Sequence, residues 1–207
     1  MAIDIDEAKL ARNEFGLWAG WTLATMLGML AGFVPPALIV GSFDLLLVRI
    51  LVPLWAGFLV GLFQWLVLHR YLTHSADWVL DTGAGWGLGF ALGLVIIELI
   101  GGSFLGTLIG YILFGIIIGL VQWPILRREV PSVFPWVLAS VAGWALGAYL
   151  APVVLSLFVT GGAVNPIVSS TVIAVVTGLV AGGITALALI WIARQPEAPV
   201  AGGEHVR

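Results

Sequence analysis

The residues that could do chemistry in this chain are a few polar side chains set inside long apolar runs. Gln64 and Gln122 each interrupt such a run, and Thr185 takes the corresponding place in a third. Polar groups in hydrocarbon are costly, so they are candidates for a function by default. Either the three side chains form a polar ring around a central conduit, or each one bonds a neighbouring helix backbone or an indole N–H. We favour the second interpretation, because both glutamines share a helix face with closely spaced glycines.

Asp81 is a carboxylate one turn inside the third apolar run. A carboxylate near a helix N-terminus is favoured by the helix dipole, and we expect Arg70 or Arg127 to lie near it. The residue is therefore interpreted as a structural charge at the membrane boundary.

Arg49 and Glu98 are predicted to form an ion pair at the other side of the membrane, with Asp44 nearby. An intramembrane carboxylate can also carry protons or ions. A path through Glu98 is the alternative interpretation of this pair.

The loop HRYLTHSAD brings His69, His74 and Asp77 close together in sequence, where they could bind a metal or ligate a pigment. Two histidines without a third firm ligand are more typical of exposed loop residues, so we predict no metal site. The chain has no cysteine, and it contains no GxSxG or HExxH motif for a nucleophile with its base or for a zinc site. The sequence therefore predicts no catalytic residues and no enzymatic activity.

The composition places these residues in a membrane. The chain has 207 residues, of which 61% are hydrophobic and 9% charged, with a mean hydropathy of +1.13. Soluble domains carry about 25% charged residues, so this surface must face lipid. The net charge of −3 is small and says nothing about nucleic acid, but the sequence has no basic patch, and we predict no nucleic-acid partner. The acidic N-terminus does not resemble a signal peptide.

The apolar residues form six runs, each near or above the ~20 residues that a spanning helix needs. They lack the alternation of barrel strands. The fold class is therefore predicted to be an all-α integral membrane protein, with polar segments 1–14 and 195–207 flanking a bundle at 15–193. The runs cover about residues 15–41, 45–68, 78–100, 103–126, 134–158 and 167–193.

The even-numbered runs share a phrase. GFLVGLFQWLVLHR at 57–70 reappears as GIIIGLVQWPILRR at 115–128 and as GLVAGGITALALIWIAR at 178–194, without the Gln-Trp pair. An internal repeat of this kind predicts three α-hairpins, at about 15–70, 78–128 and 134–194. Small residues four apart permit close helix packing in lipid, and we assign that role to Gly57, Gly61, Gly115, Gly119, Gly178 and Gly182.

The odd-numbered runs carry small residues as well. We match Gly20, Ala24 and Gly28 to two further triplets, and place a tryptophan after the first member of each. The matched triplets are Gly85, Gly89, Gly93 and Gly143, Gly147, Ala151, with tryptophans Trp21, Trp86 and Trp144.

Tryptophan is abundant at one side of the predicted bundle. Trp65 and Trp123 follow the two glutamines, whereas Trp86 and Trp144 lie too deep for an interfacial aromatic belt. We expect the deep pair to pack between hairpins against the glycine faces. A shelf for a pigment or lipid is the alternative.

The basic residues predict the orientation. Of the eight, only Arg49 falls between an odd-numbered run and its even-numbered partner. By the positive-inside tendency, both termini are predicted to be cytoplasmic, in a bacterial plasma or photosynthetic membrane. The hairpins then share one orientation, as parallel repeats in a pseudo-threefold bundle.

The repeated phrases resemble those of a group of uncharacterised multi-pass proteins of cyanobacteria and Chloroflexota, which carry tandem Gln-Trp-Leu-x-Leu-Arg segments. The matching segments are QWLVLHR at 64–70, QWPILRR at 122–128 and WVLASVAGWALG at 136–147. The resemblance covers four of the six runs and implies a membrane repeat architecture without an activity. The layout is also similar to that of mitochondrial carriers, but their Pro-x-Asp/Glu-x-Lys/Arg signature is absent.

These observations predict a non-enzymatic integral membrane subunit or scaffold that packs against partner helices, lipid or pigment. The alternative is a small transporter or channel with its path on the repeat axis. A conduit needs polar groups along its wall, and these are sparse here. The sequence specifies no cofactor.

We predict that reporter fusions at residues 74 and 131 report a cytoplasmic location and that a fusion at residue 162 reports the other side. The reason is that seven of the eight basic residues lie on the side of the termini and of loops 69–77 and 127–135. A cytoplasmic signal from position 162 would contradict the six-span arrangement.

Overall fold

Six long helices form this protein, as the apolar runs predict. The computed structural model describes residues 7–40, 46–72, 77–128, 132–158 and 165–194, and this part contains helices and no strands. The helices are α1 (Glu7–Val40), α2 (Leu46–Leu68), α3 (Trp78–Leu99), α4 (Phe104–Leu126), α5 (Phe134–Ser156) and α6 (Pro166–Ala193). Each contains a segment long and apolar enough to cross a membrane.

Local signals set several helix ends. Ser103 begins α4 by accepting a hydrogen bond from the Gly106 amide at 3.1 Å, and Asn165 begins α6 by accepting one from Ile167 at 2.8 Å. These side chains satisfy amides that lack a partner within the first helical turn. Between α3 and α4 the chain turns through Gly101 and Gly102, whose φ angles of 75° and 66° favour glycine.

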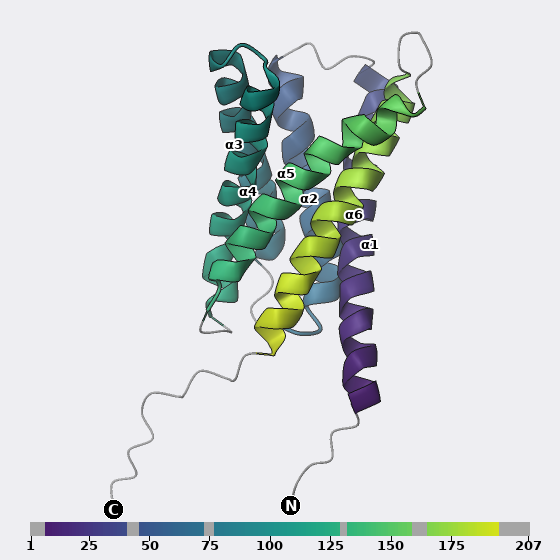
Figure 1. Ribbon diagram of the computed structural model, residues 1–207, viewed down its shortest axis with the longest axis vertical. Helices are drawn as coiled ribbons and strands as arrows, with labels where there is room; N and C mark the ends of the chain where they lie inside the picture. The colour runs from purple at the N-terminus through teal and green to yellow at the C-terminus, as the bar shows by residue number, and fades with distance from the viewer. Residues whose placement is uncertain (1–6, 41–45, 73–76, 129–131, 159–164, 195–207) are drawn as a thin grey trace, which may run out of the picture.

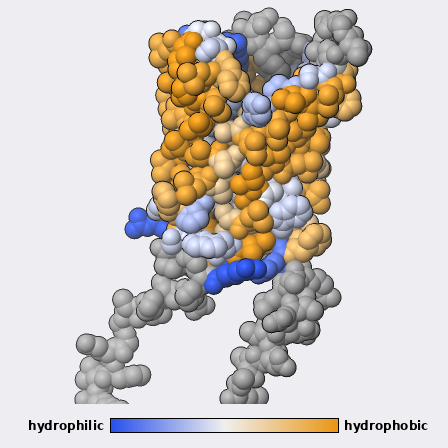
Figure 2. Space-filling model, in the orientation of Figure 1, coloured by the Kyte–Doolittle hydropathy of each residue, from blue (hydrophilic) through white to orange (hydrophobic). Residues whose placement is uncertain are grey.

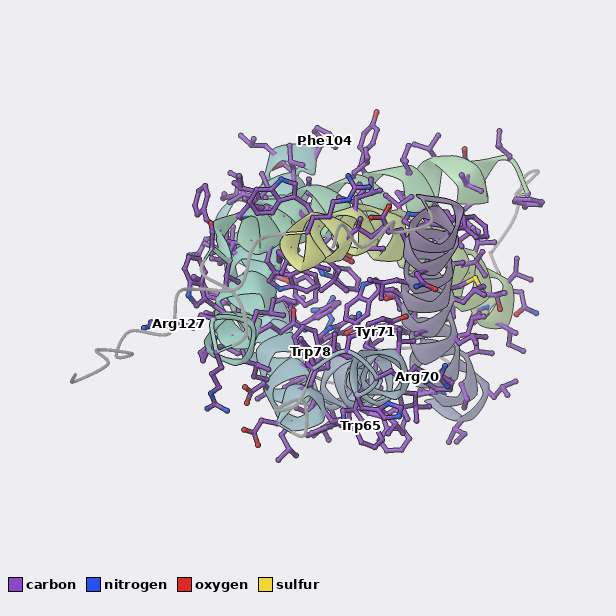
Figure 3. All side chains as sticks on the ribbon, turned by 90° about the horizontal axis from the view of Figure 1, so that it is seen from below. Trp65, Arg70, Tyr71, Trp78, Phe104 and Arg127 are labelled. Carbon is purple, nitrogen blue, oxygen red and sulfur yellow. The ribbon has the colours of Figure 1, made fainter. Side chains whose placement is uncertain are left out.

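The helices form a closed ring. Each one packs against its neighbours in the chain, and α6 packs against α1, while no close backbone approach crosses the ring among the described residues. Figure 3 shows this ring end-on, with side chains filling the space inside it. The start of α1 and the end of α6 lie at the same end, the lower end in Figure 1, which we call the terminal end.

Glycines lie where the helices approach most closely. On α1, a Cβ added to Gly28 would lie 2.5 Å from the Cα of Val60 on α2. On α4, a Cβ on Gly115 would lie 2.6 Å from the Cα of Val141 on α5. One set of glycines on each odd-numbered helix faces the following helix, namely Gly28 and Gly32 on α1, Gly85, Gly89 and Gly93 on α3, and Gly143 and Gly147 on α5. Gly83 and Gly87 of α3 face the preceding helix, α2. The paired glycines of the even-numbered helices (Gly57 and Gly61, Gly115 and Gly119, Gly178 and Gly182) face α3, α5 and α1 respectively.

The expected match of Gly20 to the other odd-numbered helices is wrong. A Cβ on Gly20 would meet only the Val67 methyl groups, at 3.8 Å, whereas Gly28 and Gly32 make the close approach to α2. The small-residue face of α1 therefore lies about two turns further along the helix, because α1 begins well before its first close contact with α2.

The outer surface of the ring is apolar. Apolar residues dominate the visible side of the bundle, and the strongly hydrophilic residues lie toward its ends (Figure 2). Large side chains such as Leu80, Phe104 and Leu187 are more than half exposed. A surface of this kind requires hydrocarbon around it. The protein is therefore an integral, multi-pass membrane protein in a lipid bilayer.

We predict that Gly61→Ala and Gly119→Ala each lower the free energy of unfolding by about 1–3 kcal/mol and therefore lower the unfolding temperature in detergent. The added methyl groups would lie 3.0 Å from the Val79 Cα and 2.8 Å from the Val137 Cα, which are backbone atoms that cannot move alone. Gly20→Ala is the control, because its methyl group has room and alanine favours the helix. Equal melting temperatures for the three variants would exclude the glycine contacts as a source of stability.

Candidate functional site

Three tryptophans from alternate helices meet inside the ring. The rings of Trp21 (α1), Trp78 (α3) and Trp136 (α5) lie 5.7–5.8 Å apart at interplanar angles of 66–76°. Each side chain is at most 1% exposed. Edge-to-face contacts of this kind are favourable for aromatic rings. We call these residues the tryptophan triad.

The triad differs from the expected match of Trp21 to Trp86 and Trp144. Trp21 contacts Trp78 and Trp136 instead. Trp78 and Trp136 lie about two turns before the expected Trp86 and Trp144, which is the same displacement as that found for the glycines of α1.

Each indole N–H of the triad donates to a side chain of an even-numbered helix. Trp78 donates to Oε1 of Gln64 at 3.1 Å, and Trp136 donates to Oε1 of Gln122 at 3.1 Å. Trp21 donates to the Thr185 hydroxyl at 2.9 Å. One residue from each of the six helices therefore takes part in this arrangement.

The glutamine amides make a second bond within their own hairpins. Gln64 donates to the Thr25 hydroxyl at 3.0 Å, and Gln122 donates to the Thr82 hydroxyl at 2.9 Å. Thr25 in turn donates to the carbonyl of Trp21 at 2.9 Å. Each glutamine thus joins three helices, since its amide reaches both the preceding and the following odd-numbered helix.

The third hairpin lacks one of these bonds. Thr185 is too short to reach across the hairpin as a glutamine does, and its hydroxyl donates to its own helix at the Ala181 carbonyl, at 2.7 Å. Ser140 on α5 holds the position that Thr25 and Thr82 hold on α1 and α3. The Ser140 hydroxyl is buried and has no hydrogen-bond partner among the described residues.

The polar side chains therefore surround the axis without lining an open path. Gln64, Gln122 and Thr185 are each at most 4% exposed and are engaged with the triad. Toward the terminal end, the triad packs in one apolar cluster with buried Leu68, Ile125, Leu126 and Val133. The centre of the ring is closed at this level.

A second aromatic cluster lies beyond the triad, in the half away from the termini. Trp86, Trp144 and Phe114 contact one another at 5.0–5.4 Å with nearly perpendicular rings. Trp86 packs against Gly57 of α2, where an added Cβ would lie 2.4 Å from the Trp86 Cβ. The two deep tryptophans thus meet each other inside the ring, and Trp86 also rests on a glycine face.

This second cluster borders a cavity of about 430 Å³. Every helix except α2 contributes to its wall, which is largely aromatic and aliphatic and contains no charged side chain among the described residues. Two residues of the wall carry buried polar atoms without a hydrogen-bond partner among the described residues, Nε1 of Trp86 and Oγ1 of Thr177.

The remaining predicted residues lie at the rim of the bundle. Trp65 and Trp123 are partly buried and pack at the edge of the triad cluster, and Figure 3 shows Trp65 on the outer side of the ring. His69 stacks beside Trp65 at 5.1 Å, and its Nδ1 lies 3.0 Å from the Trp65 carbonyl. The described residues contain no cluster of metal ligands, and His74 lies outside them.

Charged residues pair at both ends of the ring. Arg49 and Glu98 approach to 3.7 Å with largely exposed side chains, and Asp44 lies outside the described residues. At the terminal end, Arg128 lies 3.6 Å from Asp77, one turn before the half-buried Asp81. The charge that pairs beside Asp81 is thus Arg128, rather than the expected Arg70 or Arg127.

The ion pair between Arg194 and Glu14 was not predicted. Arg194 donates two hydrogen bonds to the carboxylate of Glu14, at 2.8 and 2.6 Å, and so ties the end of α6 to α1. Glu14 precedes the first apolar run and Arg194 follows the last. A prediction that the ring closes between these two runs would have placed the two residues together.

Comparisons with known protein families, curated proteins and solved structures give no match to this chain. The resemblance to the cyanobacterial and Chloroflexota proteins stays a prediction.

We predict that Thr82→Val lowers the free energy of unfolding by about 1 kcal/mol, because it removes the hydroxyl that accepts from Gln122. Ser140→Ala at the corresponding position of α5 is expected to be neutral or stabilising, because it removes a buried hydroxyl that has no partner. Thermal unfolding in detergent, followed by circular dichroism, compares the two. Equal losses would mean that Ser140 makes a bond of the same value.

Proposed function

We propose that this protein is a non-enzymatic, non-conducting subunit or scaffold of a larger membrane complex, which packs against partner helices, lipid or pigment. The observation that carries the proposal is the closed network around the tryptophan triad. Gln64, Gln122 and Thr185 are each bonded to an indole of the triad and are not free to replace the hydration shell of a passing ion.

The network also opposes the movement that transport requires. An alternating carrier must open its centre in turn to each side. Opening here would break indole bonds that reach three even-numbered helices (Trp78 to Gln64, Trp136 to Gln122, Trp21 to Thr185). It would also separate close glycine contacts at several interfaces. A ring held in this way is suited to present a fixed surface to partners.

We further propose that the three hairpins are parallel repeats and that the terminal end faces the cytoplasm of a bacterial plasma or photosynthetic membrane. Arg70, Arg127, Arg128 and Arg194 follow the even-numbered helices at that end, and Arg49 lies at the other. The matching bonds of Gln64 and Gln122 support the repeat.

A second candidate is a small-molecule or ion transporter with its path on the ring axis. The cavity of about 430 Å³ favours it, because a blind cavity that ends at a closed layer is what one state of a carrier presents. This candidate requires the triad to separate during each cycle.

Gln64→Leu distinguishes the two candidates. For a scaffold, we expect the variant to lose about 0.6–2 kcal/mol of stability through the bonds to Trp78 and Thr25. Ion and solute flux through liposomes containing either protein should equal that of empty liposomes. Leu66→Ala, on the lipid-facing side of the same helix, is the control for a general effect of mutating α2.

A wild-type flux above background that Gln64→Leu abolishes without a change in melting temperature would overturn the scaffold proposal. Co-purification from native membrane gives an independent measurement, in which a stoichiometric membrane-protein partner or a bound chromophore is the expected result.

A further inference from the structure

We propose that the cavity beyond the tryptophan triad binds an uncharged, bilayer-soluble molecule that carries a hydrogen-bond-accepting carbonyl oxygen, and that this molecule enters from the bilayer between α4 and α5. The inference names a ligand class for the binding role proposed above and rests on that role.

The size and wall of the cavity suit a neutral apolar ligand. Its volume of about 430 Å³ falls within the range of ligand pockets, roughly 300–1,000 Å³. Phe33, Trp86, Phe90, Phe114 and Trp144 supply an aromatic wall, and within the part of the chain that the structure describes no Asp, Glu, Lys, Arg or His lines the cavity. A charged ligand would find no opposite charge at this depth, which makes its binding costly.

Two side chains of the wall carry a buried hydrogen-bond donor without an acceptor among the described residues. The Trp86 indole can only donate, and its Nε1 has no partner among the described residues although the side chain is 1% exposed. Thr177 is likewise buried and unpartnered. By contrast, Thr25 on α1 and Thr185 on α6 donate to the carbonyl four residues before them. Thr177 makes no such bond.

An unmet donor in a membrane interior is expensive. A ligand carbonyl can accept from the indole or the hydroxyl, and a hydrocarbon cannot. Two other hydroxyls of the wall are engaged, because Thr107 donates to the Ser103 carbonyl and Ser169 to the Pro166 carbonyl. The fully buried polar atoms of the wall that lack a partner among the described residues are those of Trp86 on α3 and Thr177 on α6.

A groove between α4 and α5 lies beside the cavity. It has a volume of about 210 Å³ and is lined only by residues of α4 and α5. Four residues line both the groove and the cavity, namely Thr107, Tyr111, Ala148 and Pro152. The two spaces are therefore adjacent, and Ala148 is a small side chain at their junction.

The helix directions explain the opening. Figure 1 shows α5 leaning away from α4 toward the end opposite the termini. At the mouth of the groove, Phe104 and Tyr149 meet edge-to-face at 6.0 Å, and both are about half exposed or more. The mouth therefore opens sideways into hydrocarbon, where a bilayer-soluble molecule resides.

The carbonyl can belong to a quinone headgroup or to an acyl ester of glycerol. The test uses the purified full chain in detergent, titrated with a short-chain ubiquinone, with dioctanoylglycerol and with decane. We expect saturable binding and a raised melting temperature with at least one carbonyl probe. The probe that binds more tightly identifies the source, and decane lacks an acceptor for either donor.

Variants locate the site. Thr177→Val keeps the shape and removes the hydroxyl, and we expect it to weaken carbonyl-probe binding about five- to tenfold. Ala148→Phe fills the junction, and we expect at least a tenfold loss. Ser140→Ala, an unpartnered hydroxyl outside the cavity wall, and Leu146→Phe, on the lipid-facing side of α5, are controls that should bind as the wild type does.

The proposal is overturned if neither carbonyl probe binds saturably, or if Ala148→Phe binds as tightly as the wild type. It is also overturned if decane binds as the carbonyl probes do and Thr177→Val leaves all three unchanged. The liposome flux measurement separates this failure from that of the proposed function. If no probe binds and the flux stays at background, only the ligand proposal is rejected. If the flux exceeds background, the scaffold proposal is rejected, whether or not a probe binds.

Discussion

The requirement that every polar group in the bilayer interior find a partner within the protein governs the centre of this molecule. A ring of six helices has no helix on its axis, so side chains must fill the space that it encloses. Three tryptophans do so in the half toward the termini, and each brings an indole N–H that lipid cannot satisfy. The acceptors come from Gln64, Gln122 and Thr185 on the helices between them. The hydrogen bonds that satisfy the indoles in the centre therefore also join neighbouring helices of the ring.

The next layer along the axis is filled less completely, and the cavity follows from that difference. Trp86 and Trp144 lie two turns beyond Trp78 and Trp136 on their helices, and on α1 the residue two turns beyond Trp21 is Met29. Met29 is buried in the same cluster as the two tryptophans. One layer thus holds three indoles and is closed, whereas the other holds two indoles and a thioether and borders open space. Replacing one large ring by a thinner side chain leaves volume that the close helix contacts cannot collapse to fill.

Hydropathy and length suffice to predict the six helices, because lipid permits little else in a chain with 9% charged residues. The sequence also favoured an indole or backbone partner for the glutamines, and the structure supplies Trp78 and Trp136. The match of Trp21 failed because it used one tryptophan and its small neighbour. A longer pattern aligns the helices correctly, with Thr or Ser four residues and Gly seven residues after each tryptophan of the triad. The sideways opening between α4 and α5 was beyond prediction, since the lean of α5 away from α4 arises from the whole ring and no local pattern encodes it.

The third hairpin departs from the pattern of the other two, and unpartnered polar groups accompany this departure. Two hairpins carry a glutamine that joins three helices, and these bonds account for the closed layer. The third hairpin has Thr185 instead, which leaves the Ser140 hydroxyl without a partner, and α6 also supplies the unpartnered Thr177 of the cavity wall. Unmet polar groups are therefore concentrated on α3, α5 and α6, the helices around the cavity and the layer beneath it. Because such groups lower stability, a chain that needed only to fill the membrane would gain by replacing them with apolar residues of similar size. Two of these groups, on Trp86 and Thr177, lie in the wall of the cavity, as a site for an oxygen-bearing ligand requires.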